Sequence, residues 1–231
     1  MISATPSKHS LVNKTDRTMR GIMVRNTTSA LGLLAAMALG CAQAQEQTSN
    51  ITEQESDLPP AGYGTLRQDQ VSVGLQSDAV QIQVVPLNEG IIRLLAQDTY
   101  NSLHRLRESK AEEIERIATR QGMREPQLFL VTFFGLQQEA RFEPEDLRVM
   151  SQNRMFRPLH IMPLSPTWSG RQLNQRETAT AVYLYDDGVR ITGPITIEYN
   201  IVRSNRWEQI LRVVDRERAA VMSRAAAERR P

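Results

Sequence analysis

The chain has few of the side chains on which most enzyme chemistry depends. Its 231 residues include one cysteine, Cys41, and three histidines. His104 and His160 are far apart in sequence, with no second histidine or cysteine at ligand spacing, whereas metal sites need such ligands to converge. Neither a Gly-x-Ser-x-Gly motif nor a glycine-rich phosphate loop is present. The sequence therefore predicts no catalytic, metal-binding or cofactor-binding residue.

The chain also lacks an apolar run long enough to cross a membrane. The longest, Ala30–Leu39, has about 10 residues, whereas a spanning helix needs roughly 20. It follows Arg20 and Arg25 and ends in small residues, which is typical of a secretory signal peptide. We therefore expect residues 1–44 to be an export signal.

Residues 1–22 are polar and patternless, and they make the basic flank unusually long. Met19 and Met23 lie closer to the apolar run. We expect translation to start at Met19 or Met23, which gives a flank of ordinary length.

Two cleavage sites fit this signal. The stretch Ala38-Leu39-Gly40-Cys41 resembles the lipobox of bacterial lipoproteins, which implies lipid on the Cys41 thiol and a membrane anchor. The alternative is cleavage after Ala44, because Ala42-Gln43-Ala44 is a small-x-small site. The lone cysteine and the tether-like segment after it favour the lipoprotein.

Basic charge is concentrated in the expected signal. Residues 1–44 hold five basic residues and one acidic residue, a net +4, so the whole-chain charge of +2 leaves about −2 for the remainder. Nucleic-acid binding is therefore not predicted. The arginine-rich end, 203–230, is interpreted as a solvated helix face, or else as a contact with anionic lipid headgroups or a cell-wall polymer.

Three segments are expected after the signal. Residues 45–68 are polar and predict a disordered linker. Residues 69–226 predict one α+β domain, and residues 227–231 a frayed tail. Alternation over 71–84 indicates a β-hairpin, and an apolar stripe over 91–121 indicates one long amphipathic helix that ends at Gly122.

The remaining segments complete an antiparallel β-sandwich-like domain. Residues 128–134 are apolar on both faces and predict a central strand. Further strands are expected over 147–149, 159–161, 178–185 and 195–199. A C-terminal helix follows, with Asn205 and Glu208 as a capping-box-like pair.

Three polar loops contain side chains that deserve a functional interpretation. Glu143, Glu145 and Asp146 suggest calcium, but the alternating ligands and central glycine of a calcium loop are missing. Residues 186–188 (Asp-Asp-Gly) are typical of a turn. Trp168 is interpreted either as a core residue or as a contact for a partner.

Residues 127–199 resemble the β-sandwiches of exported bacterial lipoproteins. The resemblance rests on Phe142-x-Pro144-x-Asp146-Leu147, on Phe156-Arg157-Pro158-Leu159 and on the strand that ends Tyr183-Leu184-Tyr185. It implies an immunoglobulin-like sandwich. The five clear strands are fewer than the seven of that type, so the early hairpin has to complete the sheets.

The first hypothesis is a non-catalytic binding or structural module of the bacterial cell envelope, periplasmic or anchored in the outer membrane. Ala42 after Cys41 resembles the outer-membrane sorting pattern. One alternative is a subunit of a larger envelope or secretion assembly. The other is an envelope hydrolase or metal-dependent enzyme, which would need a cleft that brings His104 or His160 to a carboxylate.

Overall fold

A computed structural model describes residues 58–229, and its centre is the apolar strand β3 (Gln127–Gly135). β3 pairs antiparallel with β2 on one side and β9 on the other, as expected for a strand that is apolar on both faces. The larger sheet has the order β1-β2-β3-β9-β7. Its other strands are β1 (Val73–Gln76), β2 (Val80–Pro86), β9 (Thr178–Tyr185) and β7 (His160–Pro163).

The predicted N-terminal hairpin is confirmed and extends this sheet. β1 and β2 pair antiparallel, with Val73 opposite Val84 and Leu75 opposite Ile82. Their apolar side chains point to one face because side chains alternate along a strand. The hairpin therefore completes the larger sheet.

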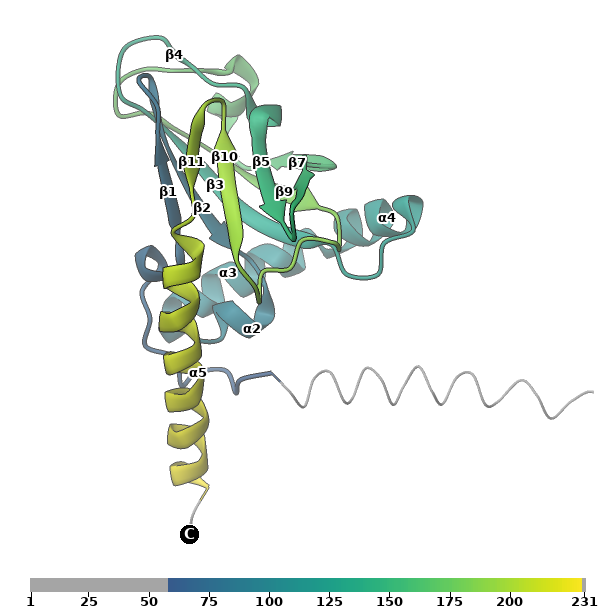
Figure 1. Ribbon diagram of the computed structural model, residues 1–231, viewed down its shortest axis with the longest axis vertical. Helices are drawn as coiled ribbons and strands as arrows, with labels where there is room; N and C mark the ends of the chain where they lie inside the picture. The colour runs from purple at the N-terminus through teal and green to yellow at the C-terminus, as the bar shows by residue number, and fades with distance from the viewer. Residues whose placement is uncertain (1–57, 230–231) are drawn as a thin grey trace, which may run out of the picture. The chain divides into compact units, whose positions relative to one another are not determined.

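A second antiparallel sheet faces the first and has the order β11-β10-β5-β6. Its strands are β5 (Leu147–Ser151), β6 (Arg154–Phe156), β10 (Ile195–Tyr199) and β11 (Val202–Ser204). Two short strands, β4 (Ala140–Arg141) and β8 (Gln172–Leu173), pair beside them. The structure therefore confirms the α+β, β-sandwich-like class (Figure 1).

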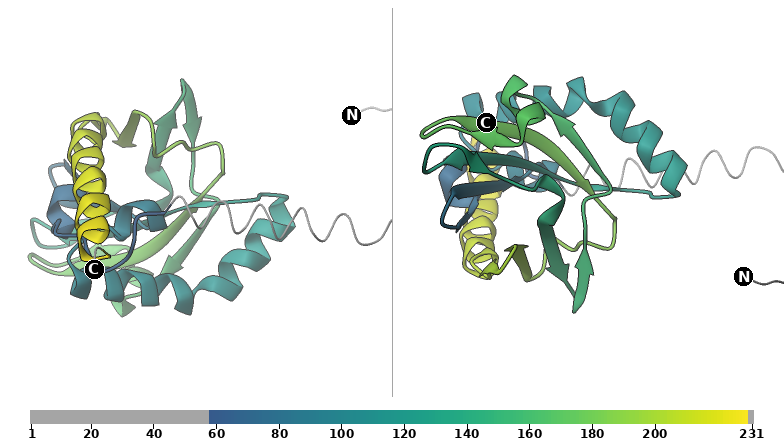
Figure 2. Two further views of the ribbon diagram at one scale, coloured as in Figure 1. Left: turned by 90° about the horizontal axis from the view of Figure 1, so that it is seen from below. Right: turned by 90° about the horizontal axis from the view of Figure 1, so that it is seen from above.

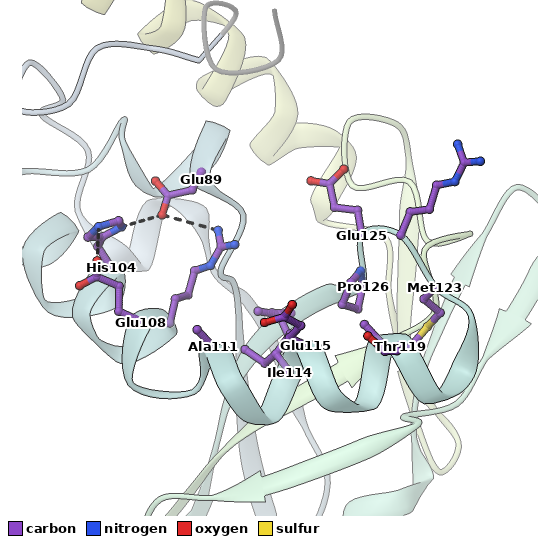
Figure 3. A pocket seen from close by; sticks show the side chains of 14 residues that line it. Glu89, His104, Glu108, Ala111, Ile114, Glu115, Thr119, Met123, Glu125 and Pro126 are labelled. Carbon is purple, nitrogen blue, oxygen red and sulfur yellow. Dashed lines mark hydrogen bonds and ion pairs between the residues drawn. The ribbon is translucent and has the colours of Figure 1, made fainter. Parts of the chain in front are cut away.

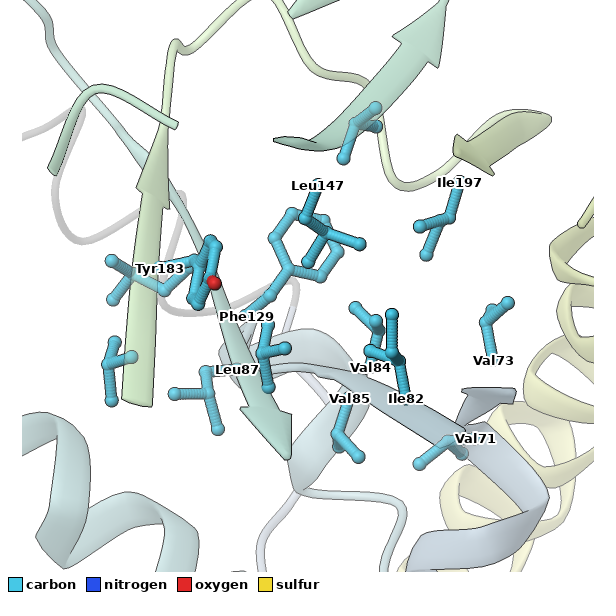
Figure 4. Close-up of a cluster of buried hydrophobic side chains, with 14 of the residues drawn as sticks. Val71, Val73, Ile82, Val84, Val85, Leu87, Phe129, Leu147, Tyr183 and Ile197 are labelled. Atoms are coloured by element: carbon cyan, nitrogen blue, oxygen red, sulfur yellow. The ribbon is translucent and has the colours of Figure 1, made fainter. Parts of the chain in front are cut away.

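The core lies between the two sheets, where side chains of both inner faces meet (Figure 4). Ile82 and Phe129 of the larger sheet are fully buried, as is Leu147 of the smaller one. Two buried tyrosines join the layers: Tyr183 Oη donates to the Pro144 carbonyl (3.0 Å) and Tyr185 Oη to that of Leu147 (2.8 Å). Burial raises the pKa of both phenols, so both remain donors.

The expected helix over 91–121 is divided into α2 (Glu89–Ile92), α3 (Gln97–Ser109) and α4 (Ala111–Gln121). The first break exists because the backbone of Leu66 inserts there: its N–H donates to Leu94 O (3.1 Å), and its carbonyl accepts from Ala96 N (2.9 Å). The second is at Lys110, whose φ of −109° and ψ of 0° are not helical. Gly122 ends α4 in the left-handed region, as predicted. Figure 2 shows α3 and α4 as a curved arm.

Leu66 lies within the segment expected to be a linker, yet it is buried. Short 3-10 helices flank the sheets: η1 (Gln68–Val71), η2 (Pro144–Asp146) and η3 (Pro166–Gly170). The packed part of the chain therefore includes residues on the linker side of the expected boundary at 69.

The C-terminal helix α5 (Trp207–Glu228) begins differently from the prediction. Its N-cap is Arg206 and has no side-chain cap, so the expected capping pair of Asn205 and Glu208 is wrong. Trp207 positions the start instead, since it is fully buried and its Nε1–H donates to Ile191 O (2.9 Å). Of the helices formed by residues 58–229, none is both long enough and apolar enough to cross a membrane.

Candidate functional site

A groove of about 580 Å³ lies between the arm formed by α3 and α4 and the start of β3 (Figure 3). We call it the α4 groove. Its floor is apolar and includes Ile114 and Ala118 of α4, Met123 after that helix, and Leu128 of β3. Ile114 and Met123 are only partly buried and pack against the core. An accessible apolar floor of this kind suits the apolar part of a ligand.

One end of the groove is a cluster of charges around Glu89, at the start of α2. Glu89 accepts a hydrogen bond from Arg93 Nε through Oε2 (3.1 Å), and its Oε1 lies 2.7 Å from His104 Nδ1. Arg107 Nη1 lies 3.6 Å from Glu89 Oε1. One carboxylate therefore joins α2 to α3, and it lies in the first turn of α2, where the helix dipole favours negative charge.

His104 lies between two carboxylates. Its second nitrogen, Nε2, is 3.4 Å from Glu108 Oε1, and its ring stacks on Tyr100 with centroids 5.2 Å apart. Because each ring nitrogen faces a carboxylate, the protonated ring can donate to both. Glu108 is 65% exposed, so it can move away and leave Nε2 open to the groove.

His160 has a different carboxylate partner. Its Nε2 lies 3.1 Å from Glu113 Oε1 on α4, which joins that helix to the edge strand β7. The two histidines are thus bound to separate acids, Glu89 and Glu113. The described residues contain no group of three or more His, Cys, Asp or Glu side chains placed to hold a metal ion.

The acidic loop residues pair with arginines. Arg171 lies 2.6 Å from Glu145 and 3.4 Å from Glu143, and Arg148 lies 3.5 Å from Asp146. These contacts explain the acidic trio without calcium.

The segment 186–188 is a turn, as predicted. Asp186 Oδ1 accepts a hydrogen bond from the backbone N–H of Gly188 (2.8 Å), and the Asp186 carbonyl accepts one from the backbone N–H of Val189 (3.2 Å). The aspartate thus stabilises its own loop.

Trp168 lies in η3 with only 8% of its surface exposed. Its ring packs edge-on against Phe142 (5.4 Å between centroids), Phe133 (5.9 Å) and Tyr183 (6.0 Å). This packing accounts for a tryptophan at this position, and its contact with a partner stays a prediction. Cys41 and Ala44 lie outside the described residues, so lipidation and cleavage also stay predictions.

Sequence reasoning missed Glu89 and the groove. The local signals were two pairs at a helical spacing of four, Glu89 with Arg93 and His104 with Glu108. The approach of Glu89 to His104 requires the break at 94–96, which no local pattern indicates. Comparisons with protein-family models, with curated proteins and with solved structures found no match to this chain.

Proposed function

We propose that this chain is an exported, non-catalytic protein of the bacterial cell envelope that acts as a binding or structural module. The α4 groove is the observation that supports it best, since it combines an apolar floor with charged side chains at both ends, the Glu89 cluster at one and Arg124 and Glu125 at the other. Such a surface fits a ligand or protein segment with an apolar body and polar ends. Lipid on Cys41 would hold the module at the membrane, in the outer membrane if the Ala42 sorting pattern operates.

Site-specific cross-linking in cells tests the binding role. A photoreactive amino acid at Thr119, an exposed groove residue, is expected to give a discrete adduct. Arg116 is the matched control, because it is exposed on the same helix but does not line the groove. The same adduct at both positions, or none at Thr119, would contradict binding in the groove.

Processing of the precursor tests the anchor. Globomycin or the substitution Cys41→Ala is expected to block maturation, so that the precursor accumulates with its signal segment uncleaved. Unchanged processing and a soluble product would instead support cleavage after Ala44 and a free periplasmic protein.

The assembly alternative predicts a larger particle. After extraction in mild detergent, size-exclusion chromatography with light scattering should give a mass well above that of the 26.1 kDa chain. A monomer would favour the independent module.

A second candidate function, an envelope hydrolase, is favoured by one observation: His104 lies in a groove 2.7 Å from the Glu89 carboxylate. That distance suits a histidine oriented by an acid to act as a general base. Purified protein and the variant His104→Ala would be compared on ester, amide and glycan substrates. Activity that vanishes in the variant supports the hydrolase, and equal rates for both proteins exclude it.

A further inference from the structure

A second pocket, also about 580 Å³, brings together three arginines from distant parts of the chain. Arg124 follows α4, Arg190 lies in the loop between β9 and β10, and Arg218 is on α5. We call this the arginine pocket. Arg124 and Arg190 are exposed, and Arg218 is partly buried. Tertiary folding alone places three permanent positive charges in one concavity.

The ion pairs formed among residues 58–229 engage other arginines. Arg93, Arg171 and Arg224 all have carboxylate partners within 4.0 Å. Arg124, Arg190 and Arg218 take part in none of those pairs. The positive charge of the pocket is therefore not neutralised by the ion-pair network of the described fold.

Arg218 is also incompletely satisfied as a hydrogen-bond donor. Its Nη2 makes a long contact of 3.5 Å to the Gly90 carbonyl, and its Nε is buried with no partner in the described structure. A buried donor without a partner is unfavourable. Because Nε itself is buried, an anion in the pocket would bind Arg218 through the Nη groups of its guanidinium.

Acidic side chains also border the pocket. Asp187 accepts a hydrogen bond from the backbone N–H of Arg124 (3.3 Å), so one of its oxygens helps to position the loop that presents Arg190. Glu125 lines the pocket as well. With these two carboxylates, the three arginines leave a net charge of +1, which favours an anion and limits how tightly it is held.

We propose that the arginine pocket binds a phosphate group carried by a small molecule or a lipid headgroup. A planar guanidinium donates two parallel hydrogen bonds to a phosphate, and arginine is suited to this geometry. A volume of about 580 Å³ exceeds that of a bare ion and leaves room for a substituent on the phosphate. Arg124 and Glu125 line both this pocket and the α4 groove, whereas Arg190 and Arg218, which the tests below change, line only the arginine pocket.

Calorimetry on the full chain in detergent tests the site, with inorganic phosphate and glycerol 3-phosphate as probes at constant ionic strength. Saturable binding is expected for the wild type, with at least a tenfold loss of affinity in Arg190→Gln and in Arg218→Gln. Arg212→Gln, an exposed arginine on α5 outside the pocket, is the matched control and should bind like the wild type. Arg190 is exposed, so its variant should fold even if the loss of the Arg218 contact with Gly90 unfolds the other.

Vesicle flotation distinguishes the two sources of phosphate. Binding to phosphatidylglycerol vesicles but not to phosphatidylcholine vesicles, lost in Arg190→Gln and kept in Arg212→Gln, identifies a lipid headgroup. Saturable binding of glycerol 3-phosphate without such vesicle binding identifies a soluble ligand. No saturable binding of either probe or vesicle, or an equal loss in the Arg190 and Arg212 variants, would overturn the site.

Discussion

Replacing Trp168 with alanine is the sharpest test of how η3 is packed against the larger sheet. Its ring is buried at the junction of η3, the larger sheet and the loop after β4, and it contacts three other aromatic rings. Truncation leaves a cavity beside Phe133 and Phe142, whose own rings stack at 4.7 Å. The stability of this junction should therefore depend strongly on the indole.

The expected loss can be worked out from the buried surface. A buried tryptophan removes about 200 Å² from water, which at about 25 cal/mol per Å² is worth about 5 kcal/mol. That value is an upper bound, because the unfolded chain already buries part of the ring. Aromatic-to-alanine changes in cores cost about 3–5 kcal/mol. We expect Trp168→Ala to lower the free energy of unfolding by about 4 kcal/mol.

Urea denaturation followed by far-ultraviolet circular dichroism measures this loss. Met222→Ala is the control, since Met222 is 52% exposed on α5 and its truncation should change stability by less than about 0.5 kcal/mol. A loss below about 1 kcal/mol in Trp168→Ala would refute the packing role. In that case the indole would be free to serve as the predicted partner contact.

Two further substitutions probe how the N-terminal segment is held. Glu217 accepts two hydrogen bonds from Thr65 (2.9 Å each). Burial raises the pKa of Glu217, but hydrogen bonds from Thr65 and Arg224 outweigh that effect and lower the pKa below its usual 4.5. The ionised side chain therefore stabilises the fold above about pH 4.5, and this contribution is lost as the pH falls through the folded-state pKa. Glu217→Gln should lower the free energy of unfolding by about 1 kcal/mol at pH 7 and by progressively less as the pH falls. Urea denaturation at a series of pH values measures this loss. A loss of stability that does not depend on pH would contradict the role of the ionised carboxylate. Gly64→Ala should cost about 1–3 kcal/mol, because its Cβ would lie 2.2 Å from the backbone of Leu94. Gly74→Ala, where a Cβ meets nothing within 4 Å, should be close to neutral, and equal thermal shifts for the two variants would disprove the close approach.

Local sequence patterns were sufficient to predict most strands of the larger sheet. Alternation over 71–84 predicted the hairpin, and the apolar segment 128–134 predicted the central strand β3. Gly122 stops α4 as expected. These predictions succeeded because side-chain periodicity and left-handed caps depend on residues adjacent in sequence.

The helical segment shows where local patterns end. Its apolar stripe is compatible with a continuous helix, yet the backbone of Leu66 breaks it at 94–96. Trp168 occupies a polar stretch and is nevertheless buried among rings from three other segments. In both cases contacts between residues distant in sequence override the local preference.

The sequence by itself determined the strand-forming segments, the α+β class and the prediction of export, because each follows from the order of neighbouring residues. Only the tertiary structure decided that Glu89 meets His104, that α4 covers a groove, and that Arg124, Arg190 and Arg218 share a pocket. The physical reason is that these groups lie on separate segments. Their convergence is set by the packing of the sheets, helices and loops, and not by the spacing of the residues along the chain.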